Sequence, residues 1–304
     1  MEEVDCALCG AYEGDPLFVG KDRLHGIDGV FQLVRCRRCG VVYLGPRPTK
    51  EEMGRYYPDE YGAYKGVNGL GLLARLAHHW GVKKKCRAVT GLKERGEILD
   101  VGCATGQFLK RMKGKGWAVR GVEVNENAVA YARERLGLDV FAGELEEAGF
   151  PEKRFDVVTM WHVLEHLHDP VGTLMEVRRV LKDKGLLIIS VPNIKSIEAR
   201  VFGEFWAGLD IPRHLYVFSP ETLGGILERA GFKVIKSCSF FGSYDAFALS
   251  TQFVIDEKLR DSHGKAVIKR IIHNPLLRLL LAPYFSLVET LNKASILTAY
   301  CVKH

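Results

Sequence analysis

The sequence lacks both a long hydrophobic run and a strong charge of one sign. No stretch reaches the roughly 18 consecutive apolar residues of a membrane-spanning helix. The most apolar segment, Leu276 to Val288, is interrupted by Arg278 and Pro283. Three of the first five residues are acidic, so we expect no secretory signal peptide and a cytoplasmic protein. The 43 basic and 37 acidic side chains leave a net charge of +6, which allows an anionic partner without requiring one.

The composition is typical of a globular protein. Hydrophobic residues make up 47% and charged residues 26% of the 304 positions, which excludes disordered, collagen-like and coiled-coil chains. At roughly 150 residues per domain, we expect one large domain and a smaller one. A chain of this length buries enough apolar surface to fold without disulfides.

Four of the eight cysteines form two C-x-x-C pairs, each followed by glycine. They are Cys6, Cys9, Cys36 and Cys39. Two sulfurs in such a pair can reach one ion, and the glycine accommodates the tight turn that follows. The pairs therefore predict a structural zinc site with four cysteine ligands in a ribbon at 1–45, although the 26 residues between them exceed the usual spacing. Disulfides and a redox C-x-x-C motif are the rival interpretations. A reducing cytoplasm disfavours the disulfides, and a redox motif does not normally occur in pairs.

Strands and helices alternate from residue 97 onward. Short apolar strands are expected at 98–101, 117–123, 139–141, 155–161 and 186–191, with helices between them, which predicts a parallel α/β sheet. We expect a linker with N-terminal helices at 46–95 and this larger domain at 96–304. A basic run in the linker, Lys83 to Lys85, is interpreted as a solvated helix face.

A ligand is expected beyond the carboxyl ends of these strands. Gly102 and Gly106 border a turn into a helix, and Glu123 ends the second strand, where a carboxylate can accept both hydroxyls of a ribose. This arrangement suits nicotinamide and adenosyl cofactors alike. The dinucleotide fingerprint fails, because Ala104 and Gln107 occupy its second and third glycine positions.

Three segments in order resemble class I S-adenosylmethionine-dependent methyltransferases. They are Glu97-Ile-Leu-Asp-Val-Gly-Cys-Ala-Thr-Gly, Gly121-Val-Glu-Val-Asn, and Phe155-Asp-Val-Val-Thr-Met-Trp-His-Val-Leu-Glu-His. The resemblance implies a Rossmann-like seven-stranded sheet. It also implies cofactor contacts from Asp100, Gly102, Cys103 and Gly106 at the methionine end, Glu123 at the ribose, Val124, Glu144 and Leu145 at the adenine, and the Trp161 backbone at the amino-acid end. Ala104 departs from the pattern, and we expect only a slight repositioning of the methionine end.

The segment His162-Val-Leu-Glu-His166 also matches H-x-x-E-H, a zinc-protease signature. The preceding strand and the nearby Pro170 argue against a helical zinc site. The alternatives are histidines with a structural role and a histidine that serves as general base for a hydroxyl acceptor. His166 is the first candidate and His214 the second, and Arg213 could hold an acceptor phosphate or carboxylate.

Two further strands are expected at 232–239 and 297–303, and about 57 residues, from 240 to 296, are inserted between them. Basic and apolar residues alternate in this predicted helical insertion. One interpretation is a helical hairpin that packs on the protein or on a second subunit. The other is peripheral contact of residues 258–288 with anionic lipid at the inner membrane face.

The combination of a four-cysteine zinc ribbon, this domain and the segment Pro212-Arg-His-Leu-Tyr-Val-Phe-Ser-Pro resembles bacterial methyltransferases of polysaccharide and sugar-nucleotide metabolism. The resemblance implies methyl transfer to a hydroxyl of a sugar, a sugar nucleotide or a glycolipid, with no specific nucleic-acid partner. One alternative is a zinc-ribbon module that binds RNA or a nucleotide through Arg35, Arg37 and Arg38. The other, less favoured, is a nicotinamide-dependent oxidoreductase.

Overall fold

A computed structural model describes residues 1–58, 72–239 and 242–304, with only the backbone described at 72–74. Residues 59–71 of the predicted linker and 240–241 of the predicted insertion lie outside the described residues. The chain divides into two compact units. The cysteine unit comprises Met1–Tyr56, Val191–Leu223 and Cys238–Thr298, and the sheet unit comprises Tyr57–Ser190, Gly224–Ser237 and Ala299–His304.

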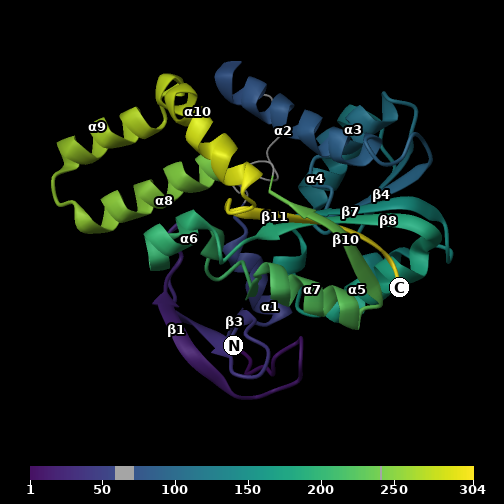
Figure 1. Ribbon diagram of the computed structural model, residues 1–304, viewed down its shortest axis with the longest axis horizontal. Helices are drawn as coiled ribbons and strands as arrows, with labels where there is room; N and C mark the ends of the chain where they lie inside the picture. Colours follow the sequence, from purple (N-terminus) through teal and green to yellow (C-terminus); the bar gives the residue numbers. More distant parts are fainter. Residues whose placement is uncertain (59–71, 240–241) are drawn as a thin grey trace. The chain divides into compact units, whose positions relative to one another are not determined.

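A seven-stranded sheet forms the centre of the sheet unit (Figure 1). Its strand order is β10-β11-β8-β7-β4-β5-β6. The strands are β4 Glu97–Val101, β5 Ala118–Glu123, β6 Val140–Ala142, β7 Phe155–Trp161, β8 Leu181–Pro192, β10 Phe232–Cys238 and β11 Ile296–Lys303. β4 pairs in parallel with β5 and β7, β5 with β6, and β7 with β8. The predicted α/β sheet is confirmed.

The central strands of this sheet are buried on both faces. Side chains of β4, β7 and β8, among them Ile98, Val157 and Ile188, are completely inaccessible to solvent. Continuous apolar runs are characteristic of parallel strands covered by helices, and each such side chain stabilises the fold by about 1.5–3 kcal/mol. The register aligns Asp100 with Gly121 of β5 and with Thr159 of β7, near the carboxyl ends of the strands.

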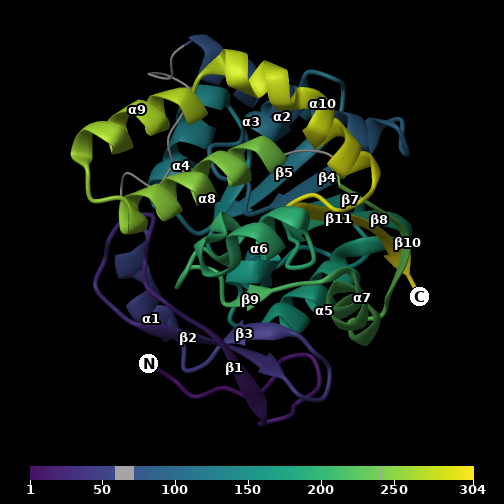
Figure 2. The same cartoon turned by 60° about the vertical axis from the view of Figure 1, so that its left-hand side comes forward.

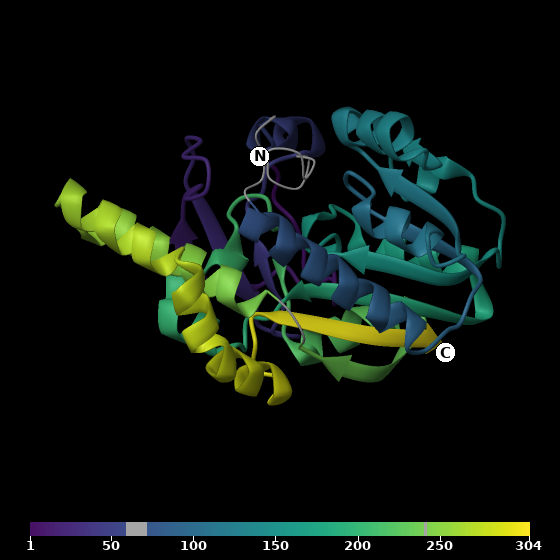
Figure 3. The ribbon, with the colours of Figure 1, turned by 90° about the horizontal axis from the view of Figure 1, so that it is seen from above.

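The sheet unit contains helices before and between these strands. They are α2 Leu72–Thr90, α3 Gln107–Lys113, α4 Glu126–Ala130, a π-helix Tyr131–Arg135, 3-10 helices Leu145–Ala148 and Leu164–His166, α5 Pro170–Val180 and α7 Pro220–Arg229. α3 packs against β5, and α2 packs against α3 (Figure 3). Asp169 caps α5 by accepting a hydrogen bond from the Gly172 backbone N–H, and Pro170 occupies the first turn, where its missing N–H costs nothing.

A small four-stranded sheet lies in the cysteine unit, in the order β1-β2-β3-β9. The strands are β1 Gly14–Gly20, β2 Phe31–Cys36, β3 Val42–Leu44 and β9 Tyr216–Val217. The short helices of this unit are α1 Lys50–Met53, α6 Ile197–Phe202 and the 3-10 helices Gly54–Tyr56, Gly203–Phe205 and Ala207–Leu209. The ribbon sheet therefore gains its fourth strand from Tyr216–Val217, where the sequence predicted no strand.

The described residues of the predicted insertion, 242–296, form three helices, α8 Ser243–Lys258, α9 Ser262–Ile272 and α10 Pro275–Thr290. α8 and α9 lie side by side, and α10 turns away from α9 by 60° (Figure 2). An aromatic cluster of Tyr244 and Phe247 on α8 with Phe285 on α10 joins the helices, with Tyr244 and Phe285 ring centroids 5.5 Å apart. Within the described residues, no single helix is long and apolar enough to cross a membrane, and only the bent pair α9 and α10 qualifies by length and composition.

Candidate functional site

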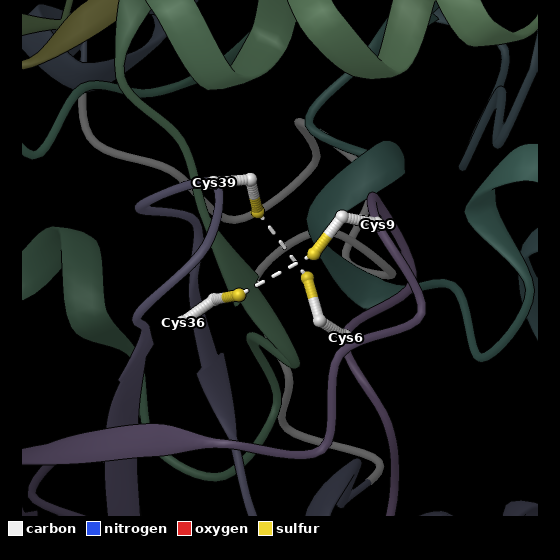
Figure 4. Close-up of side chains that lie close together, drawn as sticks. All are labelled: Cys6, Cys9, Cys36 and Cys39. Carbon is white, nitrogen blue, oxygen red and sulfur yellow. Dashed lines mark hydrogen bonds between the residues drawn. The ribbon is translucent and has the colours of Figure 1, made fainter.

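The four predicted zinc ligands converge on one point in the cysteine unit (Figure 4). The Sγ atoms of Cys6 and Cys39 are 3.4 Å apart, those of Cys9 and Cys36 are 3.5 Å apart, and all four lie within 4.8 Å of one another. A tetrahedral zinc with Zn–S bonds of about 2.3 Å requires sulfur atoms about 3.8 Å apart. The cluster therefore has the size of a closed zinc site with no position left for a substrate.

The two turns that carry the cysteines have the same geometry. The Gly10 backbone N–H donates to the Cys6 carbonyl at 2.7 Å, and the Gly40 N–H donates to the Cys36 carbonyl at 3.0 Å. Both glycines have a positive φ, 69° and 77°. The requirement for glycine inferred from the sequence is therefore confirmed, because other residues adopt this conformation only with strain.

The loop after β4 holds three residues at the carboxyl edge of the sheet in left-handed conformations. Gly102, Ala104 and Gly106 have φ values of 67°, 48° and 76°. A Cβ atom at Gly102 would lie 2.5 Å from Val163, and one at Gly106 would lie 2.5 Å from Leu138. The two glycines are thus required by backbone conformation and by close packing. Ala104 carries the strain that a glycine would relieve.

Glu123 ends β5 with its carboxylate fixed by this loop. Its Oε2 accepts from the Ala104 backbone N–H at 2.8 Å, and its Oε1 accepts from the Asn125 N–H at 2.9 Å. These bonds use two of the roughly four lone-pair positions of a carboxylate, so capacity remains for the hydroxyls of a ribose. Burial raises the pKa of Glu123, and the bonds from Asn125 and Ala104 oppose that shift.

Asp100 lies at the end of β4 and is almost fully buried. The Thr159 hydroxyl donates to its Oδ1 at 2.6 Å. Burial raises the pKa of Asp100 to about 7, against the opposing effects of this hydrogen bond and of the Lys85 charge. Burial is therefore the dominant influence at this carboxylate.

Lys85 of α2 is a site residue that the sequence analysis missed. Its ammonium lies 5.2 Å from the centre of the Trp161 ring, and burial lowers its pKa while the Asp100 charge raises it. The interpretation of Lys83 to Lys85 as a solvated face is wrong for Lys85. A run of three lysines in a sequence does not show which of them points toward the protein interior. That depends on which face of the helix packs against the protein, and the structure is needed to show it.

The remaining predicted cofactor residues differ in exposure. Val124 is 61% exposed and Glu144 is exposed, whereas Leu145 and Trp161 are buried. An exposed valine directly after a strand end provides apolar surface for a flat ring. Cys103 is buried beside Gly121, where an added Cβ would lie 2.6 Å from its sulfur, and burial raises its pKa well above the usual value. A packing role for Cys103 is therefore better supported than a nucleophilic one.

The H-x-x-E-H segment forms a loop and a short 3-10 helix. His162 has a positive φ of 60°, and only Leu164–His166 are helical. His162 Nδ1 lies 3.1 Å from Glu165 Oε1. Two histidines on one face of an α-helix, as the zinc-protease signature requires, are therefore not formed here.

His166 is half-buried and contacts a residue from the N-terminal part of the sheet unit. Its Nδ1 lies 2.8 Å from the Tyr57 hydroxyl. When Nδ1–H donates to the tyrosine oxygen, Nε2 carries the lone pair and can accept a proton. Tyr57 is the second residue missed from the sequence, because nothing in its surroundings signals a partner 109 positions away.

His214 and Arg213 lie in the cysteine unit and are both buried. His214 Nδ1 is 2.9 Å from the Gly208 carbonyl oxygen. The Arg213 guanidinium donates to Asp22, to Asp210 and to the Tyr56 carbonyl at 2.7–3.1 Å. These bonds occupy all five of its N–H groups, so Arg213 holds protein carboxylates and has no donor left for an acceptor.

Replacing Arg213 with methionine should lower the free energy of unfolding by about 3–5 kcal/mol, because two carboxylates lose their buried partner. Burial raises the pKa of Asp22, but hydrogen bonds from Arg213 and the His25 N–H outweigh it, so the net pKa is lowered. The stabilisation is therefore present above about pH 4 and is lost as the pH falls through the lowered pKa.

Urea denaturation at neutral and acid pH measures this effect. The difference between wild type and Arg213→Met should shrink below about pH 4. Arg200→Met, at an exposed position of α6, is the matched control and should have a negligible effect. A loss as small as the control's would contradict the assigned role of Arg213.

The fold and the strand-end site define the class of the protein. The sheet order, the loop after β4 and the carboxylate after β5 are those of a Rossmann-like methyltransferase. Residues 75–237, just over half of the chain, match a family described as a methyltransferase domain, and the chain belongs to this family. The nicotinamide-dependent alternative is thereby set aside.

Individual relatives agree with this membership. The chain is 32% identical over 149 residues to a probable S-adenosylmethionine-dependent methyltransferase of Mycobacterium tuberculosis, covering 48% of this chain and 52% of the relative. It is 32% identical over 157 residues to a ubiquinone biosynthesis O-methyltransferase of Ruegeria sp., covering 47% and 62%. The chain thus spans about half the length of the curated relatives it matches.

A solved structure shows the same fold. The crystal structure of a SAM-dependent methyltransferase from Archaeoglobus fulgidus superimposes with a TM-score of 0.51 at 24% identity, over 74% of this chain and 94% of that one. At this identity the similarity concerns the fold.

Proposed function

We propose that the protein transfers a methyl group from S-adenosylmethionine to a hydroxyl of a sugar, a sugar nucleotide or a glycolipid. The observation that carries the cofactor assignment is the Glu123 carboxylate, held by two backbone N–H groups at the carboxyl edge of the sheet. Bound S-adenosylmethionine supplies an electrophilic methyl group on a sulfonium. The chain's own residues then orient the acceptor and remove its proton.

Each predicted contact has a defined part in this proposal. The loop of Asp100, Gly102, Cys103 and Gly106 borders the methionine end, and Lys85 is positioned to meet its carboxylate. Glu123 accepts from the ribose hydroxyls, and the exposed Val124 with Glu144 and Leu145 flanks the adenine. His166 Nε2 accepts the acceptor proton, with Tyr57 fixing the other ring nitrogen. His214 is retained as a second candidate base.

The proposal of a hydroxyl acceptor rests on the reactivity of hydroxyl groups and not on a single contact in the structure. A hydroxyl is a weak nucleophile that needs a base, and His166 has the side chain for that task. The named O-methyltransferase relative favours a second candidate, a hydroxyl on an intermediate of ubiquinone biosynthesis. Release of S-adenosylhomocysteine in a screen of sugar, glycolipid and quinone-type acceptors discriminates between the two.

An RNA acceptor is less well supported. Of the three arginines that motivate it, Arg37 is neutralised by Asp15 at 2.7 Å and by Glu13 at 3.6 Å. Ion pairing of this kind reduces the local positive field that phosphate binding requires.

Glu123→Ala should weaken binding of S-adenosylhomocysteine by roughly 10²-fold or more, because two hydrogen bonds to a charged group are lost. Isothermal titration calorimetry measures the change. Glu126→Gln, an exposed acidic residue three positions along, is the matched control and should leave affinity unchanged. Equal affinities of Glu123→Ala and the wild type would refute the ribose assignment.

The zinc is proposed as a structural ion held by Cys6, Cys9, Cys36 and Cys39. Support comes from the sulfur separations and from the matching glycine turns. The ion would contribute folding free energy to the small sheet and take no part in methyl transfer.

A further inference from the structure

The outer face of the helical insertion exposes a continuous apolar stripe. Leu276, Leu280 and Leu287 of α10, and Leu291 directly after its end, recur at helical spacing and are 54–75% exposed. Leu279 and Tyr284 widen the stripe, and Val267 and Ile271 of α9 are also exposed. Contiguous apolar surface of this kind is rare on a protein that has no partner there.

The leucines of the stripe are not part of the core that packs the helices of the insertion together. The opposite face of α10 carries Phe285, Val288 and Leu281, and Phe285 and Leu281 belong to the aromatic cluster with α8. The Tyr244 hydroxyl donates to the Ile272 carbonyl at 2.6 Å, which ties the end of α9 to α8. Because this packing fixes the rotation of α10, the leucines are directed outward by the fold.

The charges around the stripe indicate what covers it. Residues 262–288 contain Lys265, Lys269, Arg270 and Arg278 and not one aspartate or glutamate. Asp256 on α8 pairs with Lys269 at 2.6 Å, and Asp245 pairs with Arg278 at 3.0 Å, while Arg270 remains exposed. In a two-fold dimer through this face, α9 and α10 would meet the same basic segment of the second copy, which between 262 and 288 has no acidic residue. An anionic lipid surface supplies both the apolar interior and the opposite charge.

We propose that α9 and α10 dock the protein on an anionic membrane surface, with the leucines of α10 entering the headgroup and acyl boundary. Tyr284, amphipathic and at the margin of the stripe, suits the interface region. At 16 residues, α10 is shorter than the roughly 20 that a spanning helix needs, which favours a helix lying along the surface. This inference rests on its own observations and is independent of the acceptor.

Vesicle flotation of the full chain tests the proposal. The wild type should float with phosphatidylethanolamine–phosphatidylglycerol vesicles and much less with phosphatidylcholine vesicles. Leu276→Glu with Leu280→Glu should lower partitioning by about 10-fold or more for each leucine, because each substitution removes apolar surface that would be buried in the lipid. Val201→Glu, at an exposed position of α6, is the control and should float like the wild type.

Other outcomes overturn the proposal. The proposal is wrong if the wild type does not bind the anionic vesicles. It is also wrong if the double variant floats with them as well as the wild type does. A wild-type dimer by light scattering that becomes monomeric in the double variant, without flotation, assigns the stripe to a second copy. If alkaline carbonate fails to extract the bound wild type from the vesicles, the stripe is assigned to insertion of the bent α9 and α10 pair into the membrane. Normal S-adenosylhomocysteine binding by the double variant shows that it is folded and separates this test from that of the proposed function.

Discussion

Replacing His166 with alanine should lower turnover by roughly 10²–10⁴-fold, the usual contribution of a positioned acid–base group. The half-buried imidazole contacts the Tyr57 hydroxyl through Nδ1, and in the proposed mechanism Nε2 would accept the proton of the acceptor hydroxyl. Affinity for S-adenosylhomocysteine should change little, because the ribose and adenine contacts are assigned to other side chains. Steady-state kinetics with a responsive acceptor, together with calorimetry, separates the two quantities.

The pH profile identifies the base more specifically. Turnover of the wild type should rise through the range in which histidine side chains ordinarily lose a proton, about pH 6–7, and this limb should vanish in His166→Ala. Tyr57→Phe should reduce turnover less, because it removes only the orienting hydrogen bond. His214→Ala tests the second candidate. Near-normal turnover in both histidine variants would show that proximity alone drives the reaction and would favour an amine or carbanion acceptor.

Substituting Cys36 with serine should abolish stoichiometric zinc and destabilise the cysteine unit by several kcal/mol. The free energy of zinc binding to zinc-finger peptides is roughly 10–16 kcal/mol and stabilises their fold. A site that loses one of its four ligands retains only part of this binding free energy. Elemental analysis of the purified wild type should give one zinc per chain. Thermal unfolding of the wild type, the variant and the chelated protein measures the stability loss.

Two controls accompany this experiment. Cys238→Ser changes a cysteine outside the cluster and should keep the zinc. His162→Ala should also keep one zinc, because His162 is paired with Glu165 in a loop and lies outside the helical geometry of a zinc protease. A second zinc in the wild type that disappears in His162→Ala would contradict this and restore the catalytic zinc interpretation.

The parallel sheet was predictable because its strands are short apolar runs separated by clear helix signals. β7 begins and ends at the predicted residues, and β4 and β5 differ by one residue at their starts. The helix expected between the second and third strands is formed as α4 followed by a π-helical turn. β8 begins at Leu181 instead of Leu186. Its charged residues Lys182 to Lys184 resemble a loop in sequence, and they lie at an irregularity between the pairs Phe155–Leu181 and Val157–Leu186 that β8 forms with β7.

The cluster of four cysteines was predictable for a similar reason. The spacing within each cysteine pair and the glycine that follows it involve residues close together in the chain, so the pattern can be recognised from the sequence alone. The positions of Tyr57, Lys85 and β9, in contrast, depend on contacts with residues that are distant in the sequence. A two-residue strand such as β9 has no periodicity of its own and exists only because β3 offers a free edge.

Arg213 shows where side-chain chemistry alone is misleading. An arginine beside a histidine in a loop suits an anionic acceptor, and the sequence offers no sign that Asp22, 191 positions away, is its partner. The structure assigns its five donors to the protein. The interpretation of Arg213 as an acceptor ligand is therefore wrong, and its role is to hold a loop of the cysteine unit.

Transfer of radiolabelled methyl from S-adenosylmethionine to an added acceptor is the most direct test of methyl transfer by this chain. Purified wild-type protein should bind S-adenosylmethionine and S-adenosylhomocysteine with one site per chain and fail to bind NAD. With a sugar, sugar-nucleotide or glycolipid hydroxyl acceptor, it should release one S-adenosylhomocysteine for each methyl group incorporated, and Glu123→Ala and His166→Ala should suppress this release. Folded protein that binds neither adenosyl compound, or that binds NAD instead, would contradict the account.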